Sequence, residues 1–241
     1  MKKIQIFSVF AVFLMTLVFA NTAKSLWPCE RGSGNILSES RDLKNFSKVV
    51  LEGSGKIFIT QGSPEQVKIE TDDNILPLVL TQVKSSTLYI GSKKSICPKK
   101  LNIYLTMKDI RSFSIDGSGD IITNGIIETP ELIIEISGSG DISINEIKAN
   151  KFGIDLSGSG DIRAKGVVQN FAAEINGSGD INCEDLETSN TAIEINGSGD
   201  AVISVKDKLA VEINGSGDVL YIGNPQVFKE IAGSGKVRQK K

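Results

Sequence analysis

Six aspartates occupy the same place in a repeated motif, Gly-Ser-Gly-Asp, and they are the side chains of this chain best placed to do chemistry. Near-copies of the motif end in Asn35, Lys56 and Lys236. Carboxylates in one file could hold a cation such as Ca²⁺, which prefers clustered oxygen ligands. Paired carboxylates could also act as acid and base in a hydrolase. The six are Asp120, Asp141, Asp161, Asp180, Asp200 and Asp218.

Other chemistries fit the composition poorly. The chain has no histidine, which removes histidine-based triads and histidine metal sites. A phosphate-binding loop would need a lysine and a helix N-terminus after the glycines, and neither follows them. A catalytic site normally interrupts a repeat once and gathers aromatic and basic side chains there, whereas these carboxylates are evenly spread. We therefore expect no catalytic residues, with a polysaccharide-acting enzyme on a β-helix as the alternative.

The motif is a structural repeat. From Gly117 onward its copies begin 18 to 21 residues apart, and the 64 residues from Gly53 to Gly117 are close to three such periods. We expect degenerate units in that gap, and a further unit at Gly32. The paired glycines should mark a corner or a narrow part of the cross-section. They are Gly117 and Gly119, Gly138 and Gly140, Gly158 and Gly160, Gly177 and Gly179, Gly197 and Gly199, and Gly215 and Gly217.

The residues around each motif predict strands. Positions two and four before the first glycine are apolar in nearly every copy, and the positions between them are polar. Side chains two apart on a strand share a face, so this is the pattern of a half-buried strand. A unit of this length cannot bury its apolar face alone and must stack on its neighbours. The sequence thus predicts an all-β, single-domain parallel β-helix, right-handed by analogy with the commoner type, with Ile136, Leu156, Ile175 and Ile195 in one buried file.

Stacking would also place the six carboxylates in a column. At a rung spacing of about 4.8 Å, neighbouring charges repel by roughly 0.8 kcal/mol in water. Solvent screening, hydrogen bonds from backbone N–H groups or the motif serine, or bound cations could offset this repulsion. Lys56 and Lys236 would add positive charge near the two ends. We expect no resident cofactor, and Ca²⁺ remains the alternative.

The order of segments indicates export. Residues 1–25 read as a signal peptide, with Lys2 and Lys3 before an apolar run and small residues after it. An N-terminal segment (26–33) precedes the solenoid (34–241), which we divide into less regular coils (34–110), regular coils (111–238) and a basic tail (239–241). Loss of the leader would take the formal net charge from −2 to −5, which disfavours nucleic acid as a partner. No second apolar stretch is long enough to span a membrane.

Three cysteines have different expected roles. Cys183 falls on the apolar face and should be buried. Cys29 and Cys97 each lie next to a proline in the less regular half, and we predict a disulfide between them. Lipid anchoring at Cys29 is the alternative, although Trp27 and Pro28 stand where small residues are wanted.

The repeat resembles a known family. The recurring Ile-Asn-Gly-Ser-Gly-Asp at 175–180, 195–200 and 213–218, the stretch 41–55 and the closing Gly-Ser-Gly-Lys at 233–236 are similar to the "putative auto-transporter adhesin, head GIN domain" family of bacterial exported proteins. The resemblance implies a β-helical fold and an adhesion or cell-envelope setting, whether periplasmic, outer-membrane-associated or extracellular. It implies a non-catalytic module for a glycan or cell-surface ligand, or a purely architectural protein. Lysines in the outer coils predict a monomer or weak dimer.

Overall fold

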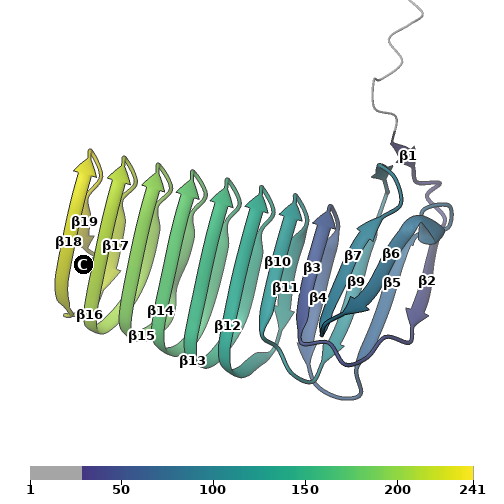
Figure 1. Cartoon of the computed structure of the whole chain (residues 1–241), viewed down its shortest axis with the longest axis horizontal. Helices are drawn as coiled ribbons and strands as arrows, with labels where there is room; N and C mark the ends of the chain where they lie inside the picture. The colour runs from purple at the N-terminus through teal and green to yellow at the C-terminus, as the bar shows by residue number, and fades with distance from the viewer. Residues whose placement is uncertain (1–28, 241) are drawn as a thin grey trace, which may run out of the picture.

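A computed structural model describes residues 29–240, and it consists of strands stacked along one axis (Figure 1). Consecutive coils pair in parallel and keep the motif in register, so that Gly138 lies opposite Gly158 and Gly158 opposite Gly177. The expected all-β solenoid is confirmed. Its regular strands are β10 (Ser112–Gly117), β11 (Asp120–Asn124), β12 (Ile126–Gly138), β13 (Ile142–Gly158), β14 (Ile162–Gly177), β15 (Ile181–Gly197), β16 (Ala201–Gly215), β17 (Val219–Ile222), β18 (Gln226–Gly233) and β19 (Val237–Gln239).

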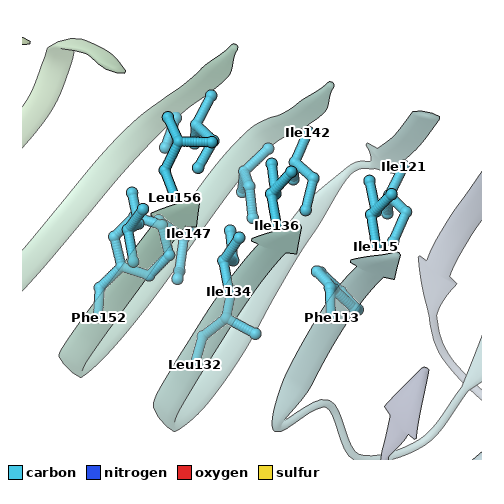
Figure 2. Close-up of a cluster of buried hydrophobic side chains, with 14 of the residues drawn as sticks. Phe113, Ile115, Ile121, Leu132, Ile134, Ile136, Ile142, Ile147, Phe152 and Leu156 are labelled. Carbon is cyan, nitrogen blue, oxygen red and sulfur yellow. The ribbon is translucent and has the colours of Figure 1, made fainter. Parts of the chain in front are cut away.

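The solenoid has two main walls that meet at the Gly-Ser-Gly-Asp corners. We call the wall whose strands lead into the motif the motif wall, and the wall whose strands leave it the return wall. Apolar side chains of both point into the space between them, as Ile115 and Ile121 do in Figure 2. Ile136, Leu156, Ile175 and Ile195 pair on successive rungs and are at most 2% exposed. The predicted buried file is therefore confirmed, and it is one part of a continuous apolar core whose burial stabilises the fold.

Both glycines of each motif lie so close to the preceding rung that a Cβ would collide with a carbonyl oxygen there, as Gly158 would with Gly138 and Gly160 with Gly140. The first glycine also has a positive φ, 135° at Gly138 and 145° at Gly158, which side chains disfavour. The close approach is thus to the neighbouring coil and not to the opposite wall.

The prediction of degenerate coils between Gly55 and Gly117 is wrong. One coil does extend the solenoid, because β3 (Lys48–Gly53) and β4 (Lys56–Gln61) pair in parallel with β10 and β11. The next strands, β7 (Thr87–Ser92) and β9 (Leu101–Met107), continue the two walls. Beyond them, β6 (Val79–Lys84) pairs antiparallel with β7, β5 (Gln66–Asp72) with β9, and β2 (Ile36–Arg41) with β5. These strands form a two-layered cap on the solenoid.

A turn with a weak sequence signal explains the error. Ser85 and Ser86 both have positive φ, 50° and 61°, and form the two-residue connection between β6 and β7. Such turns usually use Asn-Gly or Asp-Gly, so Ser-Ser gives little warning of a hairpin. A short 3₁₀ helix at Leu76–Leu78, with Pro77 inside it, comes just before β6.

The Gly32 copy of the motif does not extend the glycine column, which corrects the sequence prediction. This segment instead wraps around the buried carboxylate of Asp72, which accepts hydrogen bonds from the N–H groups of Gly34 (2.7 Å) and Lys99 (2.8 Å). The Lys100 N–H makes a longer contact of 3.4 Å. Asp72 therefore links residues 32–35, which we call the N-terminal strap, to the loop before β9.

The predicted disulfide between Cys29 and Cys97 is confirmed, with the two Cα atoms 5.6 Å apart. It stands beside the short parallel pair β1 (Glu30–Arg31) and β8 (Ile96–Cys97). A cysteine sulfur in a disulfide has no free valence for a lipid thioether, so this bond excludes lipid anchoring at Cys29. Cys183 is buried as expected, and burial raises the pKa of its thiol to about 12.

The predicted signal peptide (1–25) and residues 26–28 of the predicted N-terminal segment lie outside the residues that the structure describes. Within residues 29–240, no helix is both long and apolar enough to cross a membrane.

Candidate ligand-binding groove

The aspartate column forms a ladder of hydrogen bonds along one corner of the solenoid. The Asp141 carboxylate accepts from the Asp161 N–H (2.8 Å), and the Asp200 carboxylate from the Asp218 N–H (2.7 Å). The Asp180 carboxylate accepts in the same way from the Asp200 N–H (2.8 Å), whereas the contact of the Asp180 N–H with Asp161 is longer, at 3.4 Å. Backbone hydrogen bonding thus offsets the repulsion within the column.

Cationic side chains lie at the two ends of this ladder. The Lys56 ammonium is 2.8 Å from the Asp120 carboxylate, as expected from the sequence. At the far end, Asp218 pairs with Arg238 at 3.1 Å, while Lys236 contributes its backbone N–H. The second compensating side chain is therefore Arg238 and not Lys236. Across residues 29–240, no three Asp, Glu, Cys or His side chains converge as a metal-binding group.

A long groove lies elsewhere, on the outer face of the motif wall. It has a volume of about 1290 Å³ and crosses the six rungs from β12 to β18. Its floor consists of the residues five positions before the first glycine of each motif, which are small in the middle and large at both ends. In rung order they are Ile133, Gly153, Ala172, Ala192, Ala210 and Phe228.

Charged and polar side chains form the two sides of the floor. One side is a row of carboxylates, one per rung, made of Glu135, Asp155, Glu174, Glu194, Glu212 and Glu230. The other side is mixed and includes Lys151, Asn170, Asn190 and Lys208. The groove therefore offers a hydrophobic strip between hydrogen-bonding groups that repeat at every rung.

Side-chain ladders hold the acidic row in place. The Asn196 amide donates both to Glu194 (3.0 Å) and to the Asn176 side chain one rung back (3.1 Å). Asn214 repeats both contacts, to Glu212 at 3.2 Å and to Asn196 at 3.1 Å. Because each amide ties its own rung to the previous one, these carboxylates are pre-positioned for a ligand.

The wall behind the floor is firmly packed. Phe152 and Phe171 stack inside the solenoid with ring centroids 5.4 Å apart, directly behind the small floor residues. Ile133 and Phe228 are by contrast 41% and 55% exposed. The groove is thus a rigid, preformed surface with an apolar contact at each end.

Sequence reasoning missed this groove. It assigned the outward positions of each strand to a polar face. The signal was available, because an outward row that reads Ile, Gly, Ala, Ala, Ala and Phe departs from the polar alternation. The structure also keeps the aspartate column apart from the groove, since none of the six aspartates lines it.

Comparison with known proteins identifies the family. The family model described as "Putative auto-transporter adhesin, head GIN domain" matches residues 45–225. The chain belongs to this family. Membership of this adhesin family and the disulfide indicate an exported surface protein. No curated protein matches the chain.

Several solved structures share the fold of this chain. A putative adhesin from Bacteroides fragilis is 26% identical, with a TM-score of 0.82 over 87% of this chain and 99% of that one. A protein from Parabacteroides distasonis described as a putative lipid binding protein is 22% identical, with a TM-score of 0.79 over 89% and 100%. A putative adhesin from Parabacteroides merdae is 22% identical, with a TM-score of 0.71 over 88% and 98%.

Proposed function

We propose that this chain is a non-catalytic, adhesin-like module of the cell envelope or surface that binds an extended ligand along the groove of its motif wall. The observation that carries the proposal is the continuity of the groove across six rungs. A cavity of this length suits a linear polymer better than a compact metabolite, and a glycan chain is the ligand class we favour. A sugar ring has apolar C–H faces for the floor and hydroxyl groups for the polar sides.

The arrangement of the carboxylates supports a binding role over a catalytic one. Each rung contributes one acidic residue to the same side, and the asparagine ladder holds Glu194 and Glu212 in equivalent positions. An enzyme acting on a polymer places its reacting groups around one bond, so that one rung differs from the others. Equivalent rungs instead give a ligand many similar contacts, whose effects combine along its length.

Filling the middle of the groove tests the proposal. Ala192 is an exposed floor residue of β15, and Ala192→Trp would place an indole across the path of the ligand. We expect glycan-array or cell-binding signals of the parent protein to fall at least tenfold in this variant. Val202→Trp, which adds the same side chain to the outer face of the return wall, is the matched control and should bind normally. Binding that survives Ala192→Trp unchanged would contradict the proposal.

An acyl chain is a second candidate for the same groove. The apolar floor and the exposed Ile133 and Phe228 favour it, and the Parabacteroides distasonis structure is described as lipid binding. Titration of the protein with a fatty acid and with phosphatidylcholine vesicles separates the two ligands. Binding of the lipid probes that Phe228→Ser abolishes, together with a blank glycan array, would select the lipid.

A further inference from the structure

A second, smaller cavity lies at the opposite end of the solenoid from β18, between the first coil and the cap. Its volume is about 250 Å³, and it shares no residue with the groove. Its walls come from the first motif corner, the end of β7 and the disulfide loop. The lining residues are Leu51, Glu52, Gly53, Ser54, Val79, Ile90, Gly91, Ser92, Ser95, Ile96, Leu101 and Ser118.

The cavity exists because the glycine column begins at Gly53. At the next corner, a Cβ on Gly117 would collide with the Gly53 carbonyl oxygen, whereas a Cβ on Gly53 would meet no atom within 4 Å. The reason is that β7 pairs with β3 only as far as Leu51 and Ile90 and then turns away into the disulfide loop. The place where a preceding corner would stack is therefore open.

This opening leaves a backbone donor without its usual acceptor. At later corners the motif serine N–H donates to the preceding glycine carbonyl, as Ser118 does to Gly53 (2.9 Å) and Ser139 to Gly117 (2.9 Å). The equivalent N–H of Ser54 has no protein acceptor within residues 29–240. An oxygen atom placed in the cavity at the position of the missing carbonyl would complete the column.

An acidic acceptor lies beside this donor. The Glu52 carboxylate lies over Gly91, with Oε2 3.1 Å from where a Cβ of Gly91 would be. Among the described residues it has neither an ion-pair partner nor a side-chain hydrogen bond. Hydroxyl groups of Ser92, Ser95 and Ser118 complete the polar lining.

The remaining surface is apolar and selects the chemistry of the ligand. Ile96 is the half-buried apolar residue of the lining, while Leu51 and Ile90 are each only 1% exposed. The carboxylate of Glu52 disfavours an anion, and the apolar side disfavours a bare metal ion. A small ring with several hydroxyl groups fits the Ser54 N–H, the Glu52 carboxylate and the apolar lining together. Its oxygens accept hydrogen bonds, its O–H groups donate them and its C–H face is apolar.

We propose that this cavity is a binding site for a single hexose-sized polyol. One hydroxyl oxygen accepts from the Ser54 N–H, two hydroxyl groups donate to Glu52, and the ring carbons contact Ile96. The site is independent of the groove, and its occupation does not require that the groove binds a polymer.

Saturation-transfer NMR on the disulfide-intact protein tests the site, with glucose, galactose, mannose and N-acetylglucosamine as probes. We expect at least one sugar to receive saturation and to shift the Ser54 amide resonance. Glu52→Gln should weaken that sugar about tenfold or more, because it removes charge-assisted hydrogen bonds. Ser95→Phe should fill the cavity and abolish the signal, whereas Glu146→Gln, at an exposed position that lines neither the cavity nor the groove, should leave it unchanged.

Two outcomes would overturn the proposal. One is the absence of saturation transfer to all four sugars at millimolar concentration. The other is a signal that persists at full strength in both Glu52→Gln and Ser95→Phe. Because Glu52 is exposed, its substitution should leave the fold intact, so the test stands even if Ser95→Phe unfolds. Melting curves of each variant verify this point.

Discussion

Two kinds of glycine in the regular coils differ in how closely the neighbouring rung approaches them. The second glycine of each motif is needed because the neighbouring rung is close, whereas Gly153 on the groove floor has only the Ile133 side chain nearby, 4.0 Å from where a Cβ of Gly153 would be. Both kinds of glycine lie on regular strands or corners and look alike in the sequence. Only the distance to the next rung distinguishes them.

Gly160→Ala should therefore destabilise the protein strongly. Its Cβ would collide with the Gly140 carbonyl oxygen, and relief of the collision would separate two rungs. We expect a loss of about 2–4 kcal/mol in the free energy of unfolding, from overpacking and weakened hydrogen bonds. Gly153→Ala is the matched control and should be neutral or stabilising by up to about 1 kcal/mol. Urea unfolding measures both, and equal losses would contradict this explanation.

The aspartate column allows a test that separates hydrogen bonding from charge. Asp180→Asn keeps an oxygen to accept from the Asp200 N–H, whereas Asp180→Ala does not. If the ladder is structural, Asn should preserve stability and Ala should cost about 1 kcal/mol in thermal unfolding. A calcium-dependent rise in melting temperature that Asp180→Asn removes would instead support the cation alternative.

At the scale of the elements, the regular coils could be predicted and the cap could not. Ile136, Leu156, Ile175 and Ile195 recur at fixed distances from the motif, and stacking then fixes their pairing. In β5 and β6 the same alternation shows which side chains are buried, but it carries no information about the partner strand or its direction. Arg41 at the end of β2 also links this strand to β6, because its guanidinium donates to the Val79 carbonyl (2.9 Å) and the Thr81 hydroxyl (2.8 Å).

The Asp72 carboxylate makes the attachment of the N-terminal strap depend on pH. Burial raises the pKa of this carboxyl group, but hydrogen bonds from the N–H groups of Gly34, Lys99 and Lys100 outweigh that effect, and the pKa lies below its ordinary value. A depressed pKa gives stability that is present above the unfolded-state pKa of about 3.9 and is lost as the pH falls through the folded value. Stability should therefore decrease below about pH 4.

Asp72→Asn should remove part of this dependence. The variant should lose about 1–3 kcal/mol at pH 7, because it leaves buried N–H donors without a charged acceptor. Its loss of stability between pH 5 and pH 2 should be smaller than that of the parent protein. Glu30, Glu70 and Asp73 also have lowered pKa values. The variant should therefore keep part of the loss of stability at low pH. Parallel pH profiles of the two proteins would show that Asp72 does not contribute.

At the scale of the whole molecule, the two ends of the solenoid differ. The N-terminal end is covered by the cap and secured by the disulfide, while no strand within residues 29–240 pairs with the outer edge of β18. On β18 the inward position that holds Ile134, Ile154, Ala173, Ile193 and Val211 in earlier rungs holds Lys229. A charge at an inward position of an edge strand is a known means of blocking strand addition.

Lys229→Val should therefore promote self-association. The substitution would join Val227 and Ile231 into an apolar edge, and Ile231 is already 37% exposed. Light scattering should show dimers or larger species in this variant and a monomer or weak dimer for the parent protein. Lys206→Val, at an exposed position away from the edge, is the control. An unchanged mass for Lys229→Val would show that this lysine does not protect the end.

The candidate sites show how far the sequence alone can predict features at this scale. The aspartates attracted attention because they repeat, yet the structure uses them as hydrogen-bond acceptors along a corner. The groove depends on six residues from six separate coils, and the small cavity depends on what is missing beside Gly53. Such features arise only after the coils are stacked.

The equivalence of successive rungs has a consequence for how such proteins can change. Each coil presents the same register to both neighbours. Duplication or deletion of one unit of about twenty residues would therefore leave the contacts between neighbouring coils the same in kind. Each added unit would lengthen the groove by about 4.8 Å, while the cap and Lys229 on β18 would remain at the two ends. Gene duplication within the chain could thus adjust the length of ligand it accommodates without redesigning a single contact.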